Sequence, residues 1–161
     1  MTSFQLVQIN VGRLLAHIDD PLIEGFKSNL DRLNAIADAT PGFIWRLVGD
    51  GNNATDIQPV PADPLFAINL SVWRDLDALA GFVYRSDHRD VMRRRREWFE
   101  PMDVFMALWW VPAGHRPTPA EALARLNLLA RMGPTSDAFT FRQPFPSPGV
   151  STITPVLDEC A

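Results

Sequence analysis

The sequence predicts an α+β domain of the ferredoxin-like type, in which two β-α-β units share one sheet. Three observations predict it. The periodic segments follow one another as strand, helix, strand, strand, helix, strand. Turn and helix-capping signals separate these segments. The length of 161 residues, with 47% hydrophobic residues, suits one domain with a sizeable core.

The first half of the chain contains the first β-α-β unit. Residues 4–12 alternate in polarity and are rich in Val and Ile, which predicts a strand. The run Asp19-Asp20-Pro21 predicts a helix start, and Pro41-Gly42 predicts its end. Residues 43–48 form the next predicted strand. The long segment from there to Pro64 is typical of a functional rim.

The second half repeats the pattern. A strand is expected over residues 65–73, followed by a helix capped by Asp75. A break at residues 84–87 separates it from a second helical piece over 88–99. The inner side of that piece should carry five residues: Val91, Met92, Arg95, Trp98 and Phe99.

A fourth strand, a third helix and a tail complete the prediction. The strand should cover residues 102–111, where adjacent Trp109 and Trp110 must face opposite sides. A capping-box pattern predicts a helix that starts at Thr118, and residues 139–145 should form a short extended segment. The predicted domain covers residues 1–145. The Pro/Ser/Thr-rich residues 146–161 should form a disordered tail.

The strands are apolar on both faces, so both faces need cover. Two helices cover one face in this arrangement, and only one further helix remains. Packing sheet against sheet with a second copy would bury the other face, so we expect a homodimer that encloses a small-molecule pocket.

Composition excludes several classes of function. The net charge of −4 disfavours nucleic-acid binding, and no apolar run approaches membrane-spanning length. The N-terminus lacks the features of a signal peptide, and the lone Cys160 is compatible with a reducing cytoplasm, so we expect a cytoplasmic protein. Phosphate-cradle, dinucleotide and serine-nucleophile motifs are absent, and the histidines are too scattered for a metal site.

The runs SVWRDLDALAGFVYRSDHRDVMRRRREWF and MALWWVPAGHRPTPAEALARLNLLARMGPTSDAFTF carry a family resemblance. Over about residues 4–145 the chain resembles domain-of-unknown-function family 3291. That family in turn resembles the dimeric α+β barrel superfamily, which includes antibiotic-biosynthesis monooxygenases, cofactor-free quinone-forming oxygenases and haem-degrading monooxygenases. The resemblance implies the fold more strongly than any one reaction.

The resemblance also suggests catalytic residues. Several monooxygenases of the superfamily carry an Asn on the first strand, a Trp that closes the third strand and a His on the second helix. The matching positions here are Asn10, Trp73 and His88. His88 is the candidate general base, and Asn10 is a candidate hydrogen-bond donor to developing negative charge. Four further residues are predicted to bind substrate: Gln8, Trp45, Phe82 and Trp110.

Each of these positions also has a plain structural interpretation. His88 could be a half-exposed histidine at a helix start, Asn10 could bond its neighbours, and most tryptophans could be core residues. The four arginines Arg93 to Arg96 are expected to be a solvated face, with anion binding by one of them as the less favoured alternative.

Three hypotheses on function follow. The first is an enzyme that acts without a cofactor on an apolar, aromatic or polyketide-like substrate, by oxygenation or by cyclisation or isomerisation, in a pocket between sheet and helices. The second is a haem-binding protein with His88 as axial ligand. The third is a dimer that binds an apolar ligand without turnover.

Overall fold

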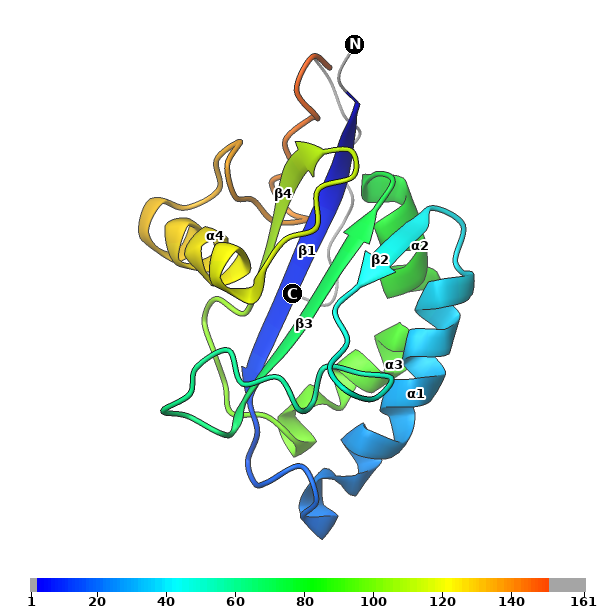
Figure 1. The fold of residues 1–161 in the computed structure, drawn as a ribbon, viewed down its shortest axis with the longest axis vertical. Coiled ribbons are helices and arrows are strands. Elements are labelled where there is room, and N and C mark those ends of the chain that lie inside the picture. The colour runs from blue at the N-terminus through cyan, green and yellow to red at the C-terminus, as the bar shows by residue number, and fades with distance from the viewer. Residues whose placement is uncertain (1–2, 151–161) are drawn as a thin grey trace.

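The centre of the protein is a four-stranded antiparallel sheet with the strand order β2-β3-β1-β4 (Figure 1). The structure is a computed structural model that describes residues 3–150. Its elements are β1 (Phe4–Arg13), the short 3₁₀ helix η1 (Pro21–Ile23), α1 (Glu24–Ala39), β2 (Phe43–Arg46), β3 (Phe66–Trp73), α2 (Leu76–Arg85), α3 (His88–Arg93), the 3₁₀ helix η2 (Arg95–Glu97), β4 (Met106–Pro112) and α4 (Pro119–Met132). This order and topology confirm the ferredoxin-like prediction.

The register of the two central strands decides which side chains share a face. β1 pairs with β3 so that Gln8 lies opposite Ser71 and Asn10 lies opposite Asn69. Side chains alternate along a strand, so these polar residues share one face, and Val7 and Ile9 of β1 belong to the other. The polar face is turned toward α1, α2 and α3. The apolar face is turned toward α4, which lies on the opposite side of the sheet (Figure 1).

The predicted helix starts are confirmed at three capping residues. The side chain of Asp20 accepts a hydrogen bond from the Leu22 amide at the start of η1. Asp75 accepts one from the Ala78 amide, and Thr118 accepts one from the Glu121 amide. Each of these bonds satisfies an amide that would otherwise lack a partner in the first helical turn.

The region after α2 differs from its prediction. The second helical piece ends at Arg93 as α3, and η2 continues it as one tight turn. Trp98 and Phe99 leave the helical path to pack with Leu14 and Ile23 in a separate hydrophobic cluster. Tertiary packing therefore overrides the helical periodicity here. β4 starts at Met106 rather than at residue 102.

The second face of the sheet is covered within the same chain. Val7, Ile9, Val72 and Trp109 are fully buried there, in one cluster with residues of α4 that include Leu126. We predicted that one remaining helix would be too little cover, and that premise is wrong. The helix is supplemented by residues 102–105 and by the segment after β2. Pairing with a second copy stays a prediction, but the need to cover this face no longer supports it.

The segment after α4 protects the outer edge of the sheet. Leu108 of β4 and Phe139 exchange two backbone hydrogen bonds, of 2.9 and 2.8 Å. Phe139 and Phe141 are buried, as expected for the short extended segment. The predicted tail lies outside the described residues from 151 onward, and so does Cys160. None of the helices in residues 3–150 combines the length and hydropathy that crossing a bilayer requires.

Candidate functional site

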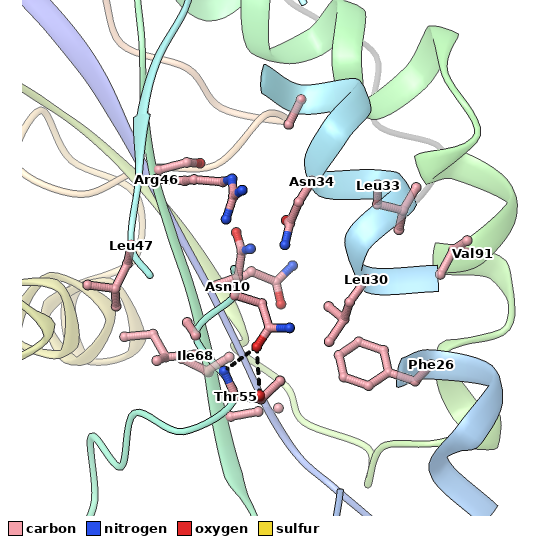
Figure 2. A pocket seen from close by; sticks show the side chains of 18 of the residues that line it. Asn10, Phe26, Leu30, Leu33, Asn34, Arg46, Leu47, Thr55, Ile68 and Val91 are labelled. Atoms are coloured by element: carbon pink, nitrogen blue, oxygen red, sulfur yellow. Dashed lines mark hydrogen bonds between the residues drawn. The ribbon is translucent and has the colours of Figure 1, made fainter. Parts of the chain in front are cut away.

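A cavity of about 200 Å³ lies between the polar face of the sheet and helices α1 to α3. Its wall includes residues of β1, β2, β3, α1, α2, α3 and η2 and of the segment 47–65. From α1, Phe26, Leu30 and Leu33 line it (Figure 2). All five residues predicted for the inner side of the second helical piece line it as well. The cavity thus occupies the predicted place between sheet and helices.

A run of rings forms one part of the wall. Phe43 meets Trp73 edge-on at a centroid distance of 5.4 Å, and Trp73 stacks on Phe82 at the same distance. Phe82 in turn contacts the imidazole of His88 at 4.8 Å. These four residues come from β2, β3, α2 and α3, and all of them line the cavity. The wall offers a flat aromatic surface beside a titratable ring.

His88 is the first residue of α3 and lies in this apolar setting. Burial lowers its pKa from 6.5 to about 4, and a hydrogen bond with the backbone of Val83 offsets only part of that effect. The imidazole is therefore neutral at pH 7. Its Nδ1 atom is buried and has no hydrogen-bond partner among residues 3–150. A buried nitrogen without a partner carries a free-energy cost, which a ligand could remove.

A chain of buried hydrogen bonds crosses the two central strands beside the aromatic run. The indole Nε1 of Trp73 donates to Oγ of Ser71 at 2.9 Å. That hydroxyl donates to Oε1 of Gln8 at 3.0 Å. Trp73, Ser71 and Gln8 are all buried. These bonds fix the orientation of the Gln8 amide and of the Trp73 ring in the cavity wall.

Asn10 is held by an arginine of the predicted helical piece. Nη1 of Arg95 donates to Oδ1 of Asn10 at 3.3 Å, and Nη2 donates to the Val11 carbonyl at 2.7 Å. The guanidinium carbon lies 4.8 Å from the ring centre of Phe99 and 4.3 Å from that of Phe105. Burial lowers the pKa of Arg95 to about 10, so it remains a cation. The Asn10 oxygen is occupied, which leaves its amide hydrogens for a ligand.

Two further polar residues of the cavity, Asn34 and Arg46, were not predicted from the sequence. Asn34 of α1 is buried, and Figure 2 shows its side chain and that of Arg46 extending toward the space beside Asn10. Arg46 is held by Asp38 at 2.8 Å and by the Asn52 carbonyl at 2.6 Å. Asn34 follows the apolar Leu33 within a helical stripe. The position of a polar amide beside this apolar stripe was the feature of the sequence that could have identified Asn34.

The segment of residues 47–65 closes one side of the cavity, as the prediction of a rim implied. Oδ1 of Asn53 accepts hydrogen bonds from both the amide and the hydroxyl of Thr55 (Figure 2). Arg13, at the end of β1, donates to Asp63 at 3.0 Å and to Glu100 at 2.7 Å. These contacts join the rim to the sheet and to the segment before β4.

Five of the seven predicted site residues line the cavity: Gln8, Asn10, Trp73, Phe82 and His88. The other two predictions, Trp45 and Trp110, do not fit its wall. A register shift between Phe43 and Trp45 turns the side chain of Trp45 to the same face of the sheet as Val72. This is the face that α4 covers, away from the cavity. Trp110 does face the helix side, opposite Trp109 as predicted. It lies on the outer strand, however, where its Nε1 donates to the Phe145 carbonyl at 2.9 Å.

The described residues contain no group of three or more His, Cys, Asp or Glu side chains that could hold a metal ion. The polar groups in the wall of the cavity are two imidazoles, two arginines, several amides and the hydroxyls of Ser71 and Thr55. Concave, mainly apolar cavities with a few convergent polar groups are the usual form of small-molecule sites in proteins.

The chain belongs to the family described as Domain of unknown function (DUF3291), whose model matches residues 5–155. This confirms the family resemblance. Comparison with curated protein sequences gives no match.

Comparison with solved structures gives three low-identity similarities. SnoaB, a cofactor-independent oxygenase from Streptomyces nogalater, is 16% identical with a TM-score of 0.43, and the alignment covers 70% of this chain and 95% of SnoaB. A protein of unknown function from Nitrosomonas europaea is 10% identical with a TM-score of 0.45, and the coverage is 72% and 95%. A protein provisionally assigned as an antibiotic-biosynthesis monooxygenase from Chloroflexus aurantiacus is 16% identical with a TM-score of 0.39, and the coverage is 71% and 97%.

Proposed function

We propose that this protein is a small-molecule enzyme that uses His88 as a general base on an apolar, aromatic or polyketide-like substrate. The observation that carries the proposal is the buried Nδ1 of His88, which has no partner within residues 3–150 and belongs to a residue of the cavity wall. A neutral imidazole has a free electron pair on one nitrogen. Because Nδ1 has no partner of its own, we assign it as the atom that accepts the proton.

The reaction would begin at a carbon beside a carbonyl group of the substrate. His88 removes a proton from that carbon, and the electron pair moves onto the carbonyl oxygen to give an enolate. The amide hydrogens of Asn10 can stabilise that oxygen. An imidazole with a low pKa is a weak base, but the negative charge of the enolate raises the pKa of the adjacent imidazolium.

Two outcomes of the enolate fit the cavity. In oxygenation the enolate reacts with dioxygen. One oxygen atom becomes a new carbonyl, and the other leaves as water, so that a CH₂ group and O₂ give a C=O group and H₂O. In cyclisation or isomerisation the enolate carbon forms a new bond or the proton returns elsewhere. We place cofactor-free oxygenation first, because the flat aromatic wall suits a planar phenolic ketone.

Deuterium exchange tests the shared first step. Anthrone, a planar ketone with an acidic CH₂ group, is incubated with the protein in deuterated buffer, and loss of its CH₂ signal is followed by NMR without oxygen. The His88→Gln variant should exchange about 100-fold more slowly than the wild type, because general-base catalysis contributes about that much or more. His115→Gln is the control, since His115 is exposed and paired with Glu121 at 2.8 Å. Equal rates in wild type and His88→Gln would contradict the proposal.

Haem binding is the second candidate, and the same unpartnered Nδ1 favours it, because a neutral imidazole nitrogen can ligate iron. The cavity of about 200 Å³ is below the ~300–1,000 Å³ typical of pockets for drug-sized ligands, so a macrocycle would require the wall to open. Absorption spectra before and after adding haem decide this. A Soret band that is lost in His88→Ala would replace the first proposal with the second.

A further inference from the structure

The lining of the cavity contains no carboxylate. Among the residues that the structure describes, its wall includes two arginines, Arg46 and Arg95, two histidines, and six side-chain amides: Gln8, Asn10, Asn34, Asn53, Gln58 and Asn69. The chain as a whole has 19 acidic against 15 basic residues. A cavity without any acidic residue in an acidic protein has a local excess of positive charge.

Arg95 differs from the other arginine of the cavity in its partners. Arg46 has the carboxylate of Asp38 at 2.8 Å. Arg95 makes no ion pair within residues 3–150, and its two hydrogen bonds go to the uncharged oxygens of Asn10 and Val11. Two of the five N–H groups of the guanidinium are thereby used. The others have no protein acceptor in the described structure.

The surroundings of Arg95 make this arrangement costly. Its guanidinium lies between the rings of Phe99 and Phe105, which shield part of it from water, and the residue is half-buried. A cation partly removed from water without a counter-ion loses solvation that two uncharged acceptors restore only in part. The planar fork is held in place by the two rings and by its bonds to β1, so its orientation is fixed before a ligand arrives. An anion in the cavity would supply the missing counter-charge.

We propose that the cavity recognises a carboxylate on its substrate, and that Arg95 binds this group while the apolar body of the molecule lies against Phe26, Leu30 and Leu33. The inference rests on the proposed function for the site and names its substrate class: a small aromatic or polyketide-like carboxylic acid. The guanidinium binds planar carboxylates through two parallel hydrogen bonds, which explains why the residue is an arginine.

Calorimetric titration with a matched pair of ligands tests this. The probes are 2-naphthoate and 2-naphthamide, which share shape and apolar area and differ in charge. Wild-type protein should bind the carboxylate at least tenfold more tightly. Arg95→Met keeps a side chain of similar length between the two rings and should remove that preference, because hydrogen bonds to charged groups contribute about ten- to hundredfold in affinity. Arg93→Met is the control, since Arg93 is exposed and faces Asp90.

Each outcome decides the point. Equal affinities for the two ligands, or no binding of either, would overturn the inference, and so would an Arg95→Met variant that keeps the preference. Arg95→Lys provides a second variant if Arg95→Met fails to fold. Its preference for 2-naphthoate over 2-naphthamide should lie between those of the wild type and Arg95→Met. Lysine keeps the positive charge but loses the two parallel hydrogen bonds of the guanidinium. The base role of His88 is judged separately: a preference that depends on Arg95, with unchanged deuterium exchange in His88→Gln, would leave this inference standing and overturn the catalytic proposal.

Discussion

The imidazole of His88 contacts the ring of Phe82, with centroids 4.8 Å apart and ring planes 52° apart. This contact joins α3 to α2 across the break in the second helical region. Burial of the imidazole, to which the Phe82 ring contributes, makes protonation unfavourable and lowers the pKa from 6.5 to about 4. The same contact therefore links the stability of the protein to the protonation of its candidate base.

The free energy of unfolding should decrease as the pH falls from about 6.5 to 4. Between these values the unfolded chain binds a proton at His88 and the folded protein does not, so acid favours unfolding. The expected slope is at most about 1.4 kcal/mol per pH unit for one group. Urea denaturation at several pH values measures it. His88→Gln should remove most of this slope. If both proteins gave the same slope, the imidazole would have to be protonated normally in the fold.

Gly12→Ala should close the cavity next to Arg95. A Cβ atom at Gly12 would lie 2.3 Å from Cδ1 of Phe99 and 3.1 Å from Nη2 of Arg95, so the ring must move. Overpacking of this kind costs about 1–3 kcal/mol of stability. Binding of 2-naphthoate should weaken as Arg95 shifts.

Gly81→Ala provides the matched control for Gly12→Ala. Gly81 lies inside α2, and nothing stands within 4 Å of the position of its Cβ atom. Alanine there should raise the free energy of unfolding by up to about 1 kcal/mol, because it favours the helix more than glycine does. Urea denaturation compares the two variants. If Gly12→Ala were as stable as Gly81→Ala, the contact between β1 and Phe99 could not be tight.

Ser71→Ala should destabilise the wall of the cavity. The hydroxyl both accepts from Trp73 and donates to Gln8, so its removal leaves two buried polar atoms without that partner. The expected loss is about 1–3 kcal/mol, together with a change in tryptophan emission as the Trp73 indole loses its acceptor. Ser28→Ala, at an exposed position of α1, should change stability by less than about 0.5 kcal/mol. Equal stability of the two variants would count against the buried chain.

Local signals in the sequence predicted most of the fold. Asp20, Asp75 and Thr118 could be identified as caps because a capping side chain acts on amides two or three residues away. The course of residues 94–105 could not be read in this way, because it depends on Trp98 and Phe99 packing against distant Leu14 and Ile23. The cover of the second face depended likewise on how α4 docks, which is a tertiary property.

The candidate site was predictable where side-chain alternation was regular. Gln8 and Asn10 lie on the cavity face because β1 has no bulge in its pairing with β3. The prediction that Trp45 lines the cavity was wrong because the irregularity after Phe43 reverses the side-chain alternation in β2. The residue types of that strand do not indicate this irregularity. Arg95 could not be distinguished from its neighbours in the run of four arginines. Whether an arginine has an acidic partner depends on the three-dimensional arrangement of the side chains, which the sequence does not show.

Leu126→Ala tests whether α4 and its neighbouring segments of the same chain cover the second face of the sheet. Leu126 is buried in one cluster with Val7, Ile9 and Trp109, so its truncation should cost about 2–5 kcal/mol. Asn127→Ala, at an exposed position of the same helix, should change stability little. Sedimentation of wild type and variant then addresses the predicted homodimer. Because α4, residues 102–105 and the segment after β2 cover this face within one chain, we expect the oligomeric state to be unchanged in Leu126→Ala and any dimer to form through another surface. A wild-type dimer that dissociates in this variant would show instead that the second copy helps to cover the face.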